Sequence, residues 1–154
     1  VPYVFGSTGP QTDHYTGTDC ADAMVGARRA MGHKRARYTS VVGLASQARP
    51  LTGVMRLHAD GRLTDADGNP QTLRWGEHFR VGDLVAMDWI SDRGDMLPRA
   101  WDHAAALVRD GSDGAEPNGI LDSEDLVRHM TTGGLRDATM QDMGNIRFRL
   151  WRWR

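Results

Sequence analysis

The sequence has few of the features that would direct it to a special environment. It contains a single cysteine, Cys20, so an internal disulfide cannot form. No apolar stretch approaches the ~20 residues that a membrane-spanning helix needs. Neither sign of charge dominates, because 19 Lys and Arg residues stand beside 20 Asp and Glu residues, for a net charge of −1. This balance gives no reason to expect nucleic acid or an anionic membrane as the main partner.

The length and composition predict one globular domain over residues 1–154. Hydrophobic residues make up 40% of the 154 residues, which is enough for a core, and no internal repeat or linker interrupts the chain. The sequence contains no recognisable signal peptide. It opens on Val1 rather than Met, so we expect a processed or excised domain, from which an upstream export signal could have been lost.

The order of periodic segments predicts an α+β fold. One or two helices come first, and several short strands follow, which favours a mainly antiparallel sheet. A second, shorter helix is expected within residues 36–51, ending before Pro50. Residues 120–130 are expected to form a helical turn that leads into a strand. The expected strands cover residues 54–60, 73–76, 81–90, 101–111, 135–140 and 145–153.

Cys20 lies where a helix is expected to begin. Thr18 or Asp19 is suited to cap this helix, alanines and other helix-forming residues follow, and Gly32 is placed to end it. Unpaired backbone N–H groups and the helix dipole favour a thiolate in the first turn, which would make Cys20 a nucleophile. A buried, inert thiol is the alternative.

Two histidines are the candidates for a base. His103 opens an apolar segment expected to be a strand, and His129 occupies a similar position in a later one. In an antiparallel sheet the two could lie side by side, so that one takes the thiol proton while the other fixes its ring. Structural histidines without a catalytic role remain the alternative for each.

Metal and cofactor sites are not expected. The segments "DADGN" and "EPNGILDSED" resemble calcium loops, but neither has oxygen ligands at the required offsets, so ordinary Asp and Asn turns are predicted. The six histidines are scattered and do not form a zinc-binding pattern. The basic, aromatic ending "RFRLWRWR" alternates as a strand with one packed face would; a patch that touches a polyanion is the alternative.

Four motifs in order resemble the bacterial NlpC-type cell-wall cysteine peptidases. They are "VPYVFGSTGP", "TDCADAMV", "VGDLVAMDW" and "WDHAAALVRDG", which together cover most of residues 1–111. A second likeness, to the putative amidase branch of the same papain-like superfamily, rests on "DWISDRGDMLPRAWDHAA" and "RHMTTGGLRD". The resemblance implies a papain-like fold in which the helix that carries the cysteine packs on a mainly antiparallel sheet.

The resemblance also implies roles for individual residues. Cys20 matches the nucleophile, His103 the general base and His129 the third member. Tyr3 matches a tyrosine near the oxyanion site, and Asp19 matches the acid before the cysteine, where it would cap the helix or bind a substrate amine.

The sequence departs from the family pattern beside the nucleophile and around the base. Asp22 is one such departure: if it pointed toward the thiol its charge would oppose a thiolate, and we expect it to face away. The segments "ISDRGDMLPRA" and "GSDGAEPNGILDSED" extend the loops on either side of the base. Three arginines are candidates to bind a stem-peptide carboxylate: Arg99, Arg128 and Arg136. A solvated surface arginine is the alternative for each.

The sequence therefore predicts a cysteine hydrolase that cleaves an amide bond, most plausibly in the peptide stem of bacterial peptidoglycan. Such a protein is expected to be a monomer and to be exported or associated with the cell envelope, although a cytoplasmic location stays open. Two alternatives remain: a catalytically silent domain of the same fold that binds cell-wall peptide or a protein partner, and an enzyme that transfers an acyl group instead of hydrolysing it.

Overall fold

The computed structural model describes residues 3–4, 19–90 and 101–154. Arg99 and most of the "ISDRGDMLPRA" segment lie outside these residues, as does the "GSTG" part of the first motif. The described chain forms one α-helix, α2 (Cys20–Ala30), and an eight-stranded, mainly antiparallel sheet, which confirms the predicted α+β class. The strands are β1 (Ala48–Pro50), β2 (Met55–Leu57), β3 (Leu63–Asp65), β4 (Leu84–Trp89), β5 (His103–Arg109), β6 (Leu126–Thr131), β7 (Gly134–Thr139) and β8 (Ile146–Trp153).

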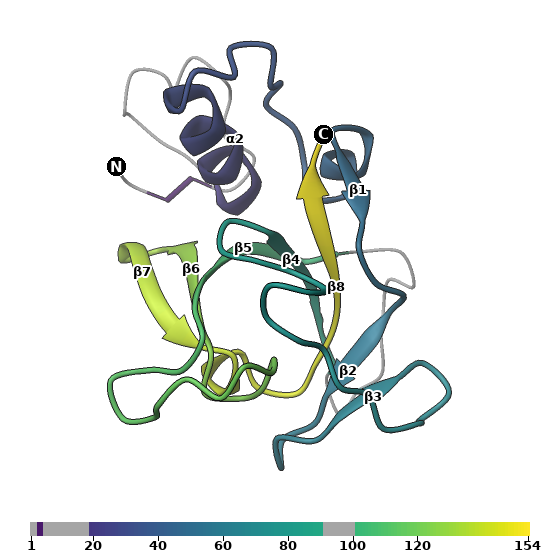
Figure 1. Ribbon diagram of the computed structural model, residues 1–154. Coiled ribbons are helices and arrows are strands. Elements are labelled where there is room, and N and C mark those ends of the chain that lie inside the picture. Colours follow the sequence, from purple (N-terminus) through teal and green to yellow (C-terminus); the bar gives the residue numbers. More distant parts are fainter. Residues whose placement is uncertain (1–2, 5–18, 91–100) are drawn as a thin grey trace.

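Strand β8 is the centre of the sheet. The strand order is β3-β2-β8-β4-β5-β6-β7, and β1 also pairs with β8. One edge of β8 pairs with β2 through its first half and with β1 through its second half, while the other edge pairs with β4 along most of its length. Figure 1 shows β8 (yellow) running between these strands toward the C-terminus. The last strand in sequence thus holds the two halves of the sheet together.

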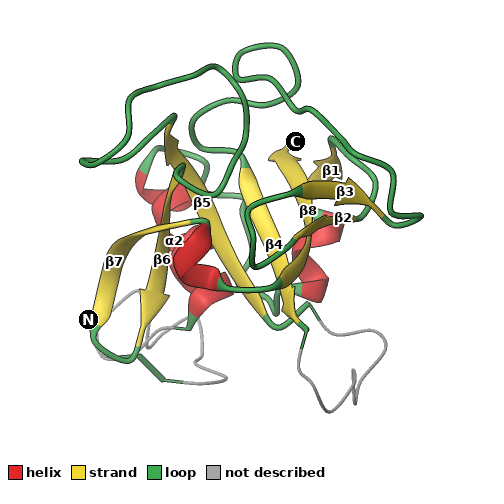
Figure 2. Cartoon of the chain, turned by 90° about the horizontal axis from the view of Figure 1, so that it is seen from below, coloured by secondary structure: helices red, strands yellow, loops and turns green. Residues whose placement is uncertain are grey.

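The two faces of the sheet carry separate apolar clusters. The first cluster lies under α2 and includes Cys20, Val25, Leu84, Ala86 and Ala104. The second lies on the opposite face. Its largest members are Phe79, Met87, Leu107, Val127, Phe148 and Leu150. Neighbouring strand residues alternate between the two clusters, as the period of two in a strand requires. Figure 2 shows α2 against β5 and β6, which it contacts.

Helix α2 follows the expected capping pattern. The Asp19 side chain accepts a hydrogen bond from the Asp22 backbone N–H at 2.9 Å, which caps the first turn. The helix ends at Ala30, and Gly32 turns the chain with a φ of +100° that few other residues tolerate. Ala21 faces Ala86 and Ala104 in the same cluster, and such small side chains allow a close approach of helix and sheet. The sequence therefore fixes both ends of the helix and its buried face.

Several predicted elements differ in the structure. The second helix is only a 3₁₀ helix, η1 (Val42–Ser46), and Pro50 lies in β1. Residues 73–76 form isolated bridges instead of a strand, while β3 occupies part of the segment expected to be a loop. Residues 120–125 contain no helix. These short elements depend on partners distant in sequence, such as the pairing of β1 with β8, which local patterns do not encode.

The basic ending of the chain forms strand β8, which confirms the alternating interpretation. Its apolar side chains at 146, 148 and 150 are fully buried. The alternate arginines have partners in the protein: Arg147 pairs with Asp88, and Arg152 binds Asp83 through two hydrogen bonds of 2.7 and 2.6 Å. Both carboxylates belong to β4 or to the turn before it, so these pairs reinforce the junction between β4 and β8.

Removing the Phe148 ring is expected to destabilise the protein more than most single changes. Phe148 is 0% exposed and lies in β8 between β2 and β4. We expect Phe148→Ala to lower the free energy of unfolding by about 3–5 kcal/mol in urea denaturation. Val81→Ala is the matched control, because Val81 is 64% exposed and should change this value by less than about 0.5 kcal/mol. Equal effects of the two changes would contradict the central role of β8.

Candidate active site

Cys20 is the first residue of α2 and lies against the sheet. Its residue surface is only 5% exposed, and it packs in the same cluster as Ala104 of β5. The backbone N–H groups of Ala104, Ala21 and Cys20 itself are directed at the sulfur. The thiol thus sits between the start of the helix and the start of β5.

Burial changes the pKa of the Cys20 thiol more than its position at the start of the helix does. The pKa of Cys20 is raised above its ordinary value, first because burial disfavours the charged form and also because the Asp19 carboxylate is close. The surrounding backbone N–H groups lower the pKa but do not outweigh burial. The resting side chain is therefore a neutral thiol, and the expectation of a preformed thiolate is wrong for the free protein.

The structure brings the two predicted histidines together. His103 is the first residue of β5, and His129 lies on the adjacent strand β6, where it is directly opposite Ala105. Nε2 of His103 and Nδ1 of His129 form a hydrogen bond of 2.9 Å. The rings meet edge to face at 87°, and the Trp89 ring lies 5.2 Å from the His103 ring. Each ring is thereby fixed by neighbours on the sheet.

Both imidazoles favour the neutral form. Burial first, and the nearby His129 second, lower the pKa of His103 to about 4. The pKa of His129 is also lowered by burial, although the carboxylates of Asp137 and Asp142 oppose the shift. At neutral pH the pair is therefore uncharged and can accept a proton.

Cys20 lies near the residue that follows His103, but Cys20 and His103 do not form a hydrogen bond in the described structure. The N–H of Ala104, the residue after His103, is directed at the sulfur. By alternation, Ala104 faces α2, whereas His103 lies opposite Met87 and shares the face of the second cluster. The described structure therefore does not bring the thiol and the His103 imidazole together, and contact between them requires a change in the backbone at the start of β5.

Tyr3 lies near Cys20, as the family resemblance implies. The Tyr3 side chain is partly buried, and its pKa is raised by burial and by the charges of Cys20 and Asp19. Asp19 caps the helix, so the structure supports the capping role. The Asp22 carboxylate is buried and accepts a hydrogen bond from the Thr39 N–H at 3.2 Å, which directs it toward the segment after the helix.

The three candidate arginines have different positions. Arg128 binds Asp137 of β7 through two hydrogen bonds of 2.7 and 3.0 Å, and it points to the opposite side of β6 from His129. The prediction that Arg128 contacts substrate is therefore not supported. Arg136 is exposed and lies directly opposite His129, on the same face as the histidine pair. Arg99 lies outside the described residues.

The sequence reasoning missed two parts of this site. Trp89 stacks beside His103 and donates from Nε1 to the Met143 carbonyl at 2.8 Å. The Ala104 N–H lies near the thiol and favours its charged form. A strand that ends in an aromatic residue, as "VAMDW" does, could have pointed to Trp89 once the pairing of β4 with β5 was known. A backbone N–H carries no sequence signal of its own.

Comparison with models of known protein families, with curated proteins and with solved structures found no match. Within residues 3–4, 19–90 and 101–154, no group of three or more His, Cys, Asp or Glu side chains is arranged to hold a metal ion. None of the helices in this part of the chain is long and apolar enough to cross a membrane. The proposals below therefore rest on the geometry of the site and on the motifs in the sequence.

The lowered pKa of His103 predicts a loss of stability in acid. Because the folded protein disfavours the charged ring, the unfolded chain binds more protons between the unfolded value of 6.5 and about 4, and stability falls as the pH falls through this range. This group should remove about 2 kcal/mol of unfolding free energy between pH 7 and pH 5. His103→Gln should show a correspondingly shallower pH dependence in urea denaturation. His33→Gln, at an exposed position, should keep the parent slope, and an unchanged slope in His103→Gln would refute the assignment.

Proposed function

We propose that the protein is a papain-like cysteine hydrolase that cleaves amide bonds. Cys20 is the nucleophile, His103 the general base, and His129 the residue that orients the base. The observation that supports this most directly is the 2.9 Å hydrogen bond between His103 Nε2 and His129 Nδ1, one residue before the Ala104 N–H that is directed at the thiol.

The hydrogen bond between the histidines can run in either direction, and one direction suits a base at His103. If Nε2 of His103 donates to Nδ1 of His129, then Nδ1 of His103 is unprotonated and can accept the thiol proton. The imidazolium formed on His103 is stabilised by the acceptor on His129. The carboxylates of Asp137 and Asp142 raise the basicity of His129 and so strengthen this acceptor.

The reaction follows from these positions. The Cys20 sulfur attacks the amide carbonyl as its proton passes to Nδ1 of His103, and the oxyanion accepts hydrogen bonds from the Cys20 N–H, with the Tyr3 hydroxyl as a second donor. Collapse of this intermediate expels the amine, which takes the proton from His103 and leaves a thioester on Cys20. Water then attacks the thioester with His103 as base, which releases the acid and restores the thiol.

In the free protein, the Cys20 thiol and the His103 imidazole are both neutral. Their proton transfer is therefore coupled to attack on the substrate, in place of a resting thiolate–imidazolium pair. Substrate binding has to bring the thiol and Nδ1 of His103 into contact. Because Cys20 packs on the α2 face of the sheet and His103 shares the face of the second cluster, a side-chain rotation alone is not sufficient, and the start of β5 has to rearrange.

The substrate we propose is the peptide stem of bacterial peptidoglycan. This class rests on the motif resemblance around Cys20 and His103, and an exported or envelope-associated location is part of the same proposal. Asp19 lies beside the thiol, where a carboxylate suits a substrate amine. Arg136, on the face of the histidine pair, suits a stem-peptide carboxylate better than Arg128, whose guanidinium is paired with Asp137.

Cys20→Ala should abolish hydrolysis while the fold is retained. We expect the release of new amines from purified peptidoglycan stem peptides, followed by mass spectrometry, to fall by at least about a thousandfold. The free energy of unfolding should change by only about 1 kcal/mol, since alanine fits the same cluster. His33→Ala is the control that should keep full activity. An active Cys20→Ala protein would refute the proposal.

The pH dependence of hydrolysis tests the role of the neutral pair. Because His103 must be uncharged to act as base, kcat/KM on an uncharged peptide amide should fall below pH 5 with an acid limb near pH 4. It should stay level through neutral pH and fall only when the thiol ionises. The matched variant is His129→Ala, which should reduce kcat more than KM, because it removes the group that orients the base. An acid limb near pH 6.5 would contradict a buried His103 as the base.

A catalytically silent binding domain is the second candidate, and one observation favours it. The Cys20 pKa is raised, and no hydrogen bond joins its sulfur to His103. Such a domain would leave stem peptides uncleaved while it binds them measurably, and Cys20→Ala would leave that binding intact. Intact stem peptides after prolonged incubation, together with saturable binding by calorimetry, would select this candidate over the hydrolase.

A further inference from the structure

A second region, away from the histidine pair, combines a cavity with concentrated positive charge. The cavity has a volume of about 750 Å³ and lies between the C-terminal part of α2, the segment that follows it and the end of β8. Five of the residues that line it are Lys or Arg, and His33 adds a sixth basic group. The five are Arg28, Lys34, Arg35, Arg37 and Arg154. No Asp or Glu is among the described residues that line the cavity.

The charges of these cations are not balanced by carboxylate side chains among the described residues, although the Arg28 guanidinium donates a hydrogen bond to the Arg154 carbonyl at 2.8 Å. None of the five forms a salt bridge with a side chain in the part of the chain that the structure describes, whereas Arg128, Arg147 and Arg152 are each paired with a carboxylate. The whole chain has a net charge of −1, so five cations around one cavity, none in a salt bridge with a described carboxylate side chain, leave the rest of the molecule acidic. Such clustering costs electrostatic free energy unless an anion compensates it.

The backbone that carries the cations is fixed by two neighbouring side chains. Nη1 of Arg29 donates to the carbonyls of Lys34 and Ala36 at 2.8 and 3.0 Å. The Gln47 side chain binds the backbone N–H and carbonyl of Arg37 at 2.7 and 2.6 Å. The loop is thus organised before any ligand arrives, which lowers the entropy cost of binding.

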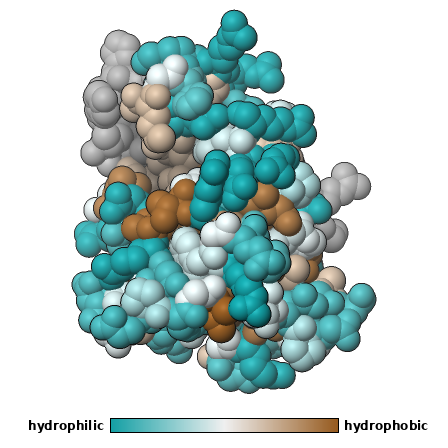
Figure 3. Space-filling view, in the orientation of Figure 1, coloured by the Kyte–Doolittle hydropathy of each residue, from teal (hydrophilic) through white to brown (hydrophobic). Residues whose placement is uncertain are grey.

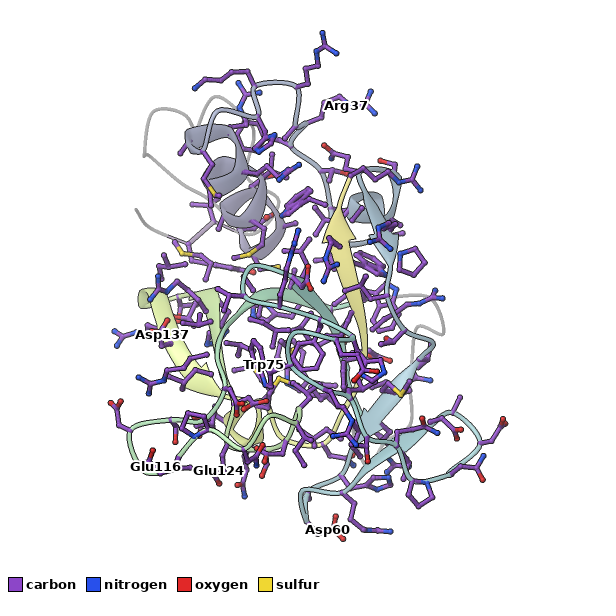
Figure 4. All side chains as sticks on the ribbon, in the orientation of Figure 1. Arg37, Asp60, Trp75, Glu116, Glu124 and Asp137 are labelled. Atoms are coloured by element: carbon purple, nitrogen blue, oxygen red, sulfur yellow. The ribbon has the colours of Figure 1, made fainter. Side chains whose placement is uncertain are left out.

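The charged side chains themselves remain available to a ligand. Lys34, Arg35 and Arg37 are all exposed. Figure 4 shows Arg37 directed away from the core at the end of the molecule above α2, and this end is hydrophilic in Figure 3. On the other wall, the partly buried Trp153 ring lies 5.3 Å from the Arg28 guanidinium, so an aromatic surface adjoins the cations.

We propose that this cavity binds a ligand that carries two or more adjacent phosphate groups. Guanidinium groups bind phosphate oxygens in pairs, and several cations around one cavity match the charge of a di- or triphosphate better than that of a single carboxylate. The volume is within the range of sites for small ligands. Such chemistry is shared by inorganic polyphosphate and by nucleoside di- and triphosphates, which differ in whether a base can use the Trp153 wall.

Calorimetric titration of the full chain with inorganic tripolyphosphate at low salt tests the proposal. We expect saturable binding that weakens as salt is added, because the contacts are between exposed charges. The double variant Arg35→Glu, Arg37→Glu should bind at least about tenfold more weakly. Arg62→Glu is the matched control on a distant loop, where the arginine is 68% exposed, and it should bind as the parent does. Cys20→Ala should also bind normally, so this test does not depend on the proposed hydrolase.

The same titration with a nucleoside triphosphate separates the two sources. Binding at least about threefold tighter than that of tripolyphosphate, lost in Trp153→Leu, would support a nucleotide ligand. Equal binding of the two would support a ligand recognised by its phosphates alone. Absence of binding for both at low salt would overturn the proposal. Unchanged tripolyphosphate binding in the Arg35→Glu, Arg37→Glu double variant would overturn it as well, as would binding confined to a single-stranded oligonucleotide.

Discussion

The pairing of β8 on both of its edges is the constraint on which the remaining structure depends. This strand joins β1 and β2, near the beginning of the sheet, to β4, and β4 in turn carries β5 and β6 with the two histidines. The chain therefore has to be nearly complete before the sheet that positions His103 is complete. Contacts between residues so distant in sequence are slow to form, because closing the intervening loop costs entropy before any contact repays it.

Competition between burial and local polarity sets the chemistry at the start of α2. A helix start and three backbone N–H groups would favour a thiolate in an exposed position. Here the thiol lies under the helix against Ala104, and the loss of solvation outweighs these dipoles. The same effect keeps His103 neutral. Because the Cys20 thiol and the His103 imidazole are neutral at rest, substrate binding does not have to remove water from a charged group. The proton transfer between them must instead take place during the reaction.

The sequence predicted those features that local patterns control. The start and end of α2 and the strands around Leu84, His103 and Phe148 follow from capping residues and from alternation. The sequence allowed His103 and His129 to be neighbours, but their adjacency depends on the register between β5 and β6. The sequence did not predict the short strands β1 and β3, because three-residue strands are stabilised by their partners more than by their own residues. The pairing of Arg128 with Asp137 was missed for a related reason, since it depends on the register between β6 and β7.

The basic cavity shows how the same residue type can have opposite roles within one chain. Some arginines form ion pairs with carboxylates in the sheet, where each pair supports the register of neighbouring segments; these are Arg128, Arg147 and Arg152. Around α2, Arg29 is likewise used internally, and it holds the loop that presents Lys34 and Arg35 without a counter-charge. The composition gives a net charge close to zero and does not reveal that positive and negative charges lie in different regions. The acidic residues that balance the basic cavity lie elsewhere in the protein. A ligand with several adjacent negative charges is the partner that such a separation favours, and it would bind at the opposite end of α2 from the thiol.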